Sequence, residues 1–132
     1  MANQTIMVDT SILIDYFRKK DKSKTKLFSL SQEFESICIS SVTEFEIYTG
    51  ANHLQQDFWK IMLKKFVVFP FDSDAALVAV DIQEKLKKIR KTIDKADLFI
   101  AATAIAHNLT FDTLNQRHFE NIESLKLLIN NK

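Results

Sequence analysis

Acidic side chains recur where the 132-residue sequence passes from an apolar run to a polar or helical stretch. Asp9 and Asp112 each follow a short apolar run, and Glu46 and Asp97 lie early in stretches with helical spacing of apolar residues. Clustered carboxylates repel one another and raise one another's pKa, so a protein that gathers them favours a bound cation. With oxygen ligands alone, that cation is expected to be Mg²⁺, or else Mn²⁺.

Scarce residue types exclude several other chemistries. One cysteine, Cys38, and three scattered histidines, interpreted as structural or surface residues, offer no spacing for a structural zinc site. The single glycine, Gly50, excludes glycine-rich phosphate loops and fits the C-terminal cap of a helix. Phosphate would therefore be bound by cations, and carboxylate-held Mg²⁺ suits phosphate-ester hydrolysis. No targeting segment or membrane-length apolar run is seen, so a cytoplasmic protein is expected, with no membrane partner.

Two clusters hold twelve of the eighteen Lys and Arg residues, although the net charge is only +1. One spans Arg18 to Lys26 and the other Lys85 to Lys95. Concentrated basic patches are typical of surfaces that bind a polyanion such as RNA, and a solvated loop and helix face is the alternative. The candidate RNA-binding residues are Arg18, Lys19, Lys20, Lys22, Lys85, Lys87, Lys88 and Arg90.

Alternating strands and helices must position the acids. Short runs of β-branched and aromatic residues predict strands at 6–8, 37–39, 66–69 and 109–111, with a last edge strand at 125–129. Helical patterns separate these runs, which predicts an α/β fold in a single domain over residues 1–132, with a mostly parallel sheet of four or five strands. Ligands bind at the carboxyl edge of such sheets, and the acids are expected to meet there.

Hydroxyl residues near the acids predict helix caps. Thr10 or Ser11 can cap the first helix, and the alternative to a chemical role for Asp9 is that it is itself an N-cap or turn residue. Ser41 with Glu44 three residues later has the pattern of a capping box, which gives Glu44 a structural role and leaves Glu46 for chemistry.

Apolar spacing also predicts the buried faces of two longer helices. For a helix over 53–65, the predicted core residues at helical spacing are Leu54, Phe58, Ile61, Met62 and Phe66. In a helix that begins at Asp72 or Ser73 they are Ala76, Leu77, Val80, Ile82, Leu86 and Ile89.

Four motifs in order are similar to those of the PIN-domain family, and they occupy residues 8–11, 39–50, 97–104 and 113–119. In the second motif an acid precedes glycine by four residues, which selects Glu46; the third begins with an acid, here Asp97. The fourth, Thr-x-Asn/Asp ending in Phe, has Asn115 at its acidic position. The resemblance runs from Ile6 to Leu128, and the compact chain resembles the VapC-type toxins of bacterial toxin–antitoxin pairs.

The resemblance implies a PIN-like three-layer α/β/α fold and a Mg²⁺-dependent endoribonuclease that hydrolyses phosphodiester bonds in RNA, often tRNA or ribosomal RNA. The implied catalytic residues are Asp9, Glu46, Asp97 and Asn115, the first three as metal ligands. Whether Asn115 or Asp112 completes the site stays open, and Thr113 is a further candidate. The implied partners are the RNA substrate, a cognate antitoxin and a second copy in a homodimer.

Two other functions compete with this hypothesis. A non-catalytic or weakly active PIN-fold RNA-binding or assembly module is favoured by Asn115, which lacks a charge, and opposed by the three retained acids. Phosphatases of the haloacid-dehalogenase type also begin with strand-Asp-Thr, but they need a second Asp where this chain has Ser11.

Overall fold

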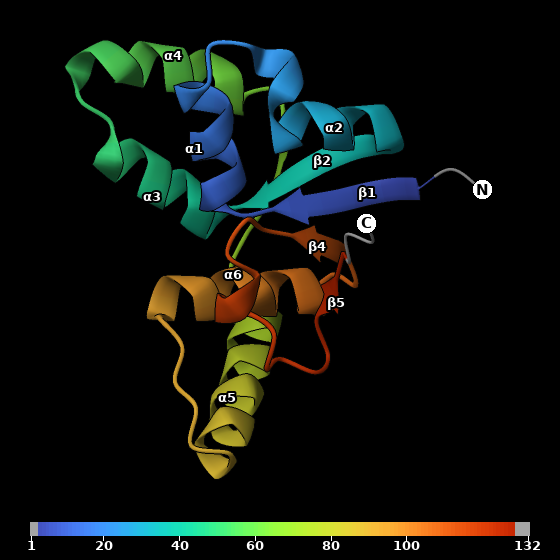
Figure 1. Cartoon of the computed structure of the whole chain (residues 1–132). Helices are drawn as coiled ribbons and strands as arrows, with labels where there is room; N and C mark the ends of the chain where they lie inside the picture. The colour runs from blue at the N-terminus through green and yellow to red at the C-terminus, as the bar shows by residue number, and fades with distance from the viewer. Residues whose placement is uncertain (1–2, 129–132) are drawn as a thin grey trace.

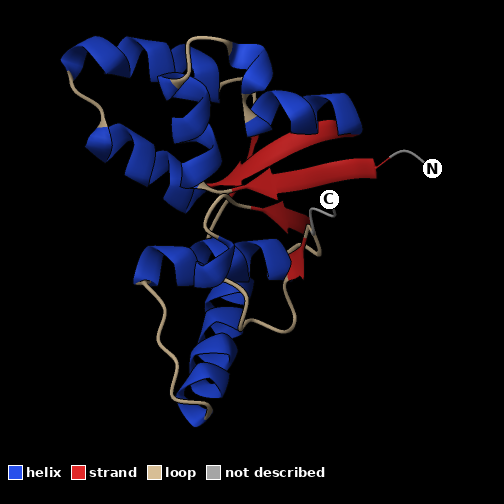
Figure 2. Ribbon diagram, viewed as in Figure 1, coloured by secondary structure: helices blue, strands red, loops and turns tan. Residues whose placement is uncertain are grey.

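The computed structural model describes residues 3–128, which form a parallel sheet with the strand order β3-β2-β1-β4-β5 (Figures 1 and 2). The strands are β1 Asn3–Val8, β2 Phe34–Ser40, β3 Val67–Phe69, β4 Thr110–Asp112 and β5 Lys126–Leu127. The helices are α1 Thr10–Arg18, η1 Lys22–Lys24, α2 Lys26–Glu33, α3 Ser41–Gly50, α4 His53–Leu63, α5 Ser73–Lys88, α6 Lys95–Ala106 and η2 Gln116–His118. The last strand is shorter than predicted, and Ile129 lies outside the described residues.

No helix in the described part of the chain is long and apolar enough to cross a membrane.

The sheet divides the core into two parts, one on each face. On β1, Met7 packs with α5 and α6, whereas Ile6 and Val8 pack with the helices α1 to α4. Figures 1 and 2 show the same division, with α1–α4 on one side of the strands and α5 and α6 on the other. Cys38 of β2 is fully buried, and burial raises the pKa of its thiol to about 12. The predicted α/β/α fold with a parallel sheet is confirmed.

Strand β1 is the central strand of the sheet, and the order in which strands are added reverses there. The chain adds β2 and β3 on one side of β1 and then crosses to add β4 and β5 on the other. Val8 is paired with Asp112, so the next residues, Asp9 and Thr113, leave the sheet side by side. Open α/β sheets bind ligands at such a crossing point, outside the carboxyl ends of the strands.

The helix caps beside the site differ from those predicted by one residue. Asp9 itself caps α1, because its Oδ1 accepts the N–H of Ser11 at 3.1 Å, so the prediction of Thr10 or Ser11 as cap is wrong. Ser40 caps α3 by accepting the N–H of Val42 at 3.0 Å. Each cap is therefore the residue at which the strand backbone is still extended.

The predicted capping box of α3 does not form. The hydroxyl of Ser41 accepts the N–H of Phe71 at 3.2 Å, which ties the start of α3 to the segment after β3. Gly50 is the last helical residue, and the cap after it is Ala51. Gly50 has no positive φ, so this helix end makes no use of glycine's conformational freedom.

Helices α4 and α5 confirm only part of the predicted core: Met62 on α4 and Ile82 and Leu86 on α5 pack there as predicted. On α4, Trp59 and Leu63 are buried, whereas Leu54 and Ile61 are 90% and 66% exposed. On α5 the exposed apolar residues are Leu77, Val80 and Ile89, and the buried ones are Ala75, Ala79, Ile82 and Leu86. Both helices carry apolar residues on more than one face, so periodicity alone does not identify the buried one.

The end of α5 holds a non-glycine residue in the left-handed region. Arg90 has φ 59°. Its N–H donates to the carbonyl of Lys87 at 3.0 Å, and the N–H of Lys91 donates to the carbonyl of Leu86 at 2.9 Å. This is a Schellman motif, in which glycine is preferred at the position of Arg90.

Replacing Arg90 with Gly is expected to raise the free energy of unfolding by about 0.5–1 kcal/mol. The change removes roughly 1–2 kcal/mol of left-handed strain and adds about 0.5–1 kcal/mol of lost glycine entropy. Urea denaturation of Arg90→Gly and Arg90→Ala measures the effect, with the alanine variant as the control that keeps the strain. Equal stability of the two variants would show that Arg90 is not strained.

Candidate active site

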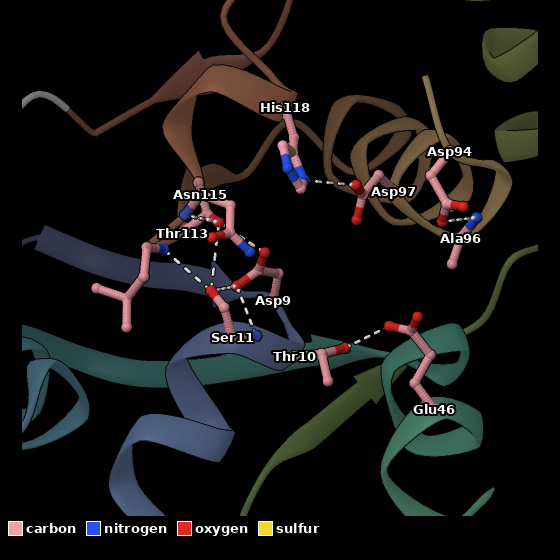
Figure 3. Close-up of polar contacts among 11 residues, drawn as sticks. Asp9, Thr10, Ser11, Glu46, Asp94, Ala96, Asp97, Thr113, Asn115 and His118 are labelled. Atoms are coloured by element: carbon pink, nitrogen blue, oxygen red, sulfur yellow. Dashed lines mark hydrogen bonds and ion pairs between the residues drawn. The ribbon is translucent and has the colours of Figure 1, made fainter. Parts of the chain in front are cut away.

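A cleft of about 790 Å³ opens at the carboxyl edge of the sheet. Three of the predicted acids line it: Asp9, Glu46 and Asp97. The amide of Asn115 and two basic side chains also line it. Figure 3 shows these carboxylates around one opening, with Asp9 at the β1–α1 junction, Glu46 on α3 and Asp97 on α6. Residues far apart in sequence therefore meet because the strand ends and helix starts share this edge.

Asp9 is held in a fixed orientation by three donors. The hydroxyl of Ser11 donates to Oδ1 at 2.6 Å, in addition to the Ser11 N–H, and the hydroxyl of Thr113 donates to Oδ2 at 2.6 Å (Figure 3). The residue is 3% exposed. Burial raises the pKa of Asp9, the hydrogen bonds from Ser11 and Thr113 oppose this, and the charge of Asp97 raises the pKa further. Thr113 thus positions Asp9 from the end of β4.

Glu46 faces the cleft from the middle of α3. The hydroxyl of Thr10, the first residue of α1, donates to its Oε1 at 2.5 Å. Glu44, one half-turn earlier, is not among the residues that line the cleft. Glu46 therefore lines the cleft and Glu44 does not, although the capping box that distinguished them in the sequence does not form.

Asp97 lies on the opposite wall, in the first turn of α6. Its Oδ2 is 3.1 Å from Nδ1 of His118, and Asp94 caps the helix by accepting the N–H of Ala96 at 3.2 Å (Figure 3). Burial raises the pKa of Asp97; the hydrogen bond and charge of His118 oppose this, and the charge of Asp94 raises the pKa.

His118 is the site residue that the sequence reasoning missed. It was interpreted as structural or surface, yet it lines the cleft and contacts Asp97. Its position could have indicated a place in the cleft, because His118 follows Asn115 by three residues in the segment after β4.

The structure separates the two candidates for the fourth position. Asn115 lines the cleft. Asp112 is fully buried: its Oδ1 accepts the N–H of Thr113 at 2.9 Å and its Oδ2 is 3.5 Å from Nζ of Lys26 on α2. Burial raises the pKa of Asp112, and the charge of Lys26 opposes the rise. Asp112 therefore joins β4 to α2 and does not line the cleft.

The first basic cluster only partly faces the cleft. Arg18 and Lys19 line it, and Lys19 also pairs with Asp15 at 3.1 Å. The ammonium of Lys22 donates to the carbonyls of residues 16, 17 and 19 at 2.5, 3.1 and 2.7 Å. There it complements the negative end of α1, a structural role that competes with RNA binding. Lys20 is exposed and does not line the cleft.

The second basic cluster lies at the far end of α5. Figure 1 shows this end of the helix pointing away from the sheet. Lys85 pairs with Asp81 at 3.0 Å, and Lys85 and Lys88 line a separate hollow against residues 121–124. Lys87 and Arg90 are exposed. None of these four side chains lines the carboxylate cleft.

The donor set of the cleft fits a hard divalent cation. Three carboxylates and an amide oxygen are the ligand types that Mg²⁺ and Mn²⁺ prefer. Burial raises the pKa of Asp9 and of Asp97, and a cation bound beside them would favour their charged forms. Within residues 3–128, no three His, Cys, Asp or Glu side chains form a ready-made metal cluster. Glu46 is bonded to Thr10 and Asp97 to His118, so a cation would compete with these two contacts.

Comparisons with known proteins point to one family. The chain matches the PIN domain over residues 6–125. It is 37% identical to Ribonuclease VapC1 of Methanocaldococcus jannaschii over 128 residues, which covers 96% of this chain and 88% of the relative. It is 31% identical to the tRNA(fMet)-specific endonuclease VapC of Shigella flexneri, with 91% and 93% covered.

Solved structures agree with these sequence matches. The fold is similar to a chain of VapBC2 from Rickettsia felis bound to a promoter DNA fragment, with TM-score 0.82, 26% identity, and 96% of this chain and 99% of that chain covered. It is also similar to a toxin–antitoxin complex from Klebsiella pneumoniae, with TM-score 0.75, 26% identity, and 94% and 96% covered.

Proposed function

The chain belongs to the PIN-domain family and, within it, to the VapC ribonuclease toxins, and from this premise we propose that Asp9, Glu46 and Asp97 form its catalytic centre. The observation that carries the proposal is that these three acids line one cleft at the crossing point of the sheet. Asn115 lines the same cleft and is proposed as the fourth catalytic residue.

A divalent cation, Mg²⁺ or Mn²⁺, would be held by the three carboxylates. When bound, such an ion lowers the pKa of a coordinated water and stabilises charge on a phosphate oxygen. The chain's own residues orient the ligands: Ser11 and Thr113 fix Asp9, and His118 contacts Asp97. Arg18 and Lys19, on the cleft wall, would bind phosphates beside the scissile bond.

Structured RNA, such as tRNA or ribosomal RNA, is the proposed substrate, and the cytoplasm is the proposed place of action. The Shigella flexneri relative is named as a tRNA(fMet)-specific endonuclease, which supports tRNA as the first substrate to test.

A cognate antitoxin and a second copy of the chain are the proposed protein partners. The similar solved structures from Rickettsia felis and Klebsiella pneumoniae are toxin–antitoxin assemblies, which supports an antitoxin. The exposed apolar side chains of Leu54 and Ile61 on α4 and of Leu77 and Val80 on α5 leave surface for such contacts.

The test of the proposed function is an RNA cleavage assay with the purified chain. With tRNA and ribosomal RNA as substrates, we expect cleavage in Mg²⁺ or Mn²⁺, and loss of cleavage when EDTA is added. Cleavage that persists in EDTA would contradict the metal-held centre. Binding of RNA without cleavage under every metal condition would favour the alternative, a non-catalytic RNA-binding module.

A further inference from the structure

A groove leads out of the carboxylate cleft past α6. A hollow of about 250 Å³ shares Asp97 and His118 with the cleft. A third hollow, of about 230 Å³, shares Leu86 and Ile93 with the second. Because neighbouring hollows share lining residues, the three lie one after another from the carboxylates to the connection between α5 and α6. We call the two hollows beyond His118 the exit groove.

Cations line the exit groove. They are Arg117 in the second hollow and Lys87, Lys91 and Lys95 in the third. All four residues are exposed, and within residues 3–128 none of them forms an ion pair. Arg18 and Lys19 line the carboxylate cleft itself. Positive charge is thus present both in the cleft and along the exit groove.

The backbone that carries Lys91 has a defined conformation. The Schellman motif at the end of α5 bonds the N–H of Lys91 to the carbonyl of Leu86, with Arg90 in the left-handed region. Thr92 and Ile93, which follow, line both outer hollows. The turn therefore directs the chain along the exit groove at the cost of strain at Arg90, and such strain is often found at functional sites.

We propose that the exit groove binds the RNA strand as it leaves the cleft, with backbone phosphates contacting Arg117, Lys91 and Lys95. This inference rests on the proposed function, because it assigns a path to the substrate of that same centre. A polynucleotide fits better than an acidic protein segment, since the groove ends at the carboxylates where a phosphodiester would be cut. Lys85 and Lys88, selected from the sequence, face another hollow and are not part of this path.

Binding of RNA as a function of salt tests the groove. Fluorescence anisotropy is measured with labelled single-stranded oligouridylate of about 4 and about 20 nucleotides, lengths that fill the cleft alone or extend beyond it. All proteins carry Asp9→Asn to prevent cleavage, in buffer without divalent cations. The test variant combines Lys91→Gln and Lys95→Gln. The matched control combines Lys60→Gln and Lys64→Gln, which removes two exposed charges on α4 and at its C-terminal cap.

For the longer RNA, the slope of log affinity against log salt should fall by about 1.4 in the test variant, since each lost phosphate contact on a single strand removes about 0.7. The shorter RNA and the control variant should show the parent's slope. Equal slopes for test and control variants on the longer RNA would overturn the proposal. If the test variant instead loses affinity only for the antitoxin, the groove binds an acidic protein segment and the proposal is wrong. Failure of the wild type to cleave RNA would count against the proposed function, a result separate from these.

Discussion

Asp97→Asn is expected to lower the rate of RNA cleavage by about 10²–10³-fold, the loss typical when one charge-stabilising group is removed from an active site. Asparagine keeps the shape of the side chain and can still hydrogen-bond to His118, so the fold should be unchanged. Rates at saturating Mg²⁺, with circular dichroism to verify folding, measure the effect. Glu44→Gln removes a charge from α3 at a position that does not line the cleft, and it is expected to retain most activity.

Asp9→Asn and Glu46→Gln should cause losses of the same order. Asp9→Asn places an amide among three donors from Ser11 and Thr113, so its thermal unfolding must be compared with that of the wild type. Full activity in any of the three variants, with normal folding, would remove that residue from the proposed centre.

The second large effect concerns stability in the absence of metal. The pKa of Asp97 is raised in the folded protein above its ordinary value of 3.8, chiefly by burial. The folded state therefore binds the proton more tightly than the unfolded state, and the free energy of unfolding falls as pH rises from about 3.8 through the raised pKa. Above that pKa the ionised carboxylate destabilises the fold.

Asp97→Asn should consequently be more stable than the wild type at pH 7 in EDTA, and the difference should shrink as the pH approaches about 4. Added Mg²⁺ should reverse the order. A cation that binds only the folded state stabilises it by about 2.7 kcal/mol at a concentration about 100 times its Kd, and the variant should lose much of this gain. Thermal unfolding across pH, with and without Mg²⁺, measures both effects. A wild type that is as stable as Asp97→Asn at every pH, and indifferent to Mg²⁺, would contradict the account.

Much of the fold follows from local pattern, and the departures have local causes. Apolar runs identified the strands because buried parallel strands carry such runs on both faces. The caps were misplaced by one residue because Ser40 and Ser41 are chemically equivalent in sequence, and only the backbone conformation separates them. The buried faces of α4 and α5 depend on which side meets the sheet, and apolar residues such as Leu54 and Leu77 are present on the solvent side as well.

The meeting of Asp9, Glu46 and Asp97 in one cleft could be predicted from strand ends, helix starts and the motifs of the family. The roles of Thr113 and His118 arise from contacts across 104 and 21 residues of sequence, which no local pattern reports. Asp112 also follows an apolar run, as Asp9 does, but its side chain pairs with Lys26, and neither of these two residues lines the cleft.

Calorimetric titration with Mn²⁺ tests most directly whether the cleft acids hold a divalent cation. The proteins are the wild type, Glu46→Gln and Glu44→Gln, two substitutions of the same kind on one helix. The wild type and Glu44→Gln should bind the ion with similar affinity, and Glu46→Gln should bind it at least about tenfold more weakly, because affinity in oxygen sites follows the number of charged ligands. Unchanged binding in Glu46→Gln, or loss of binding in Glu44→Gln alone, would contradict the assignment of the centre.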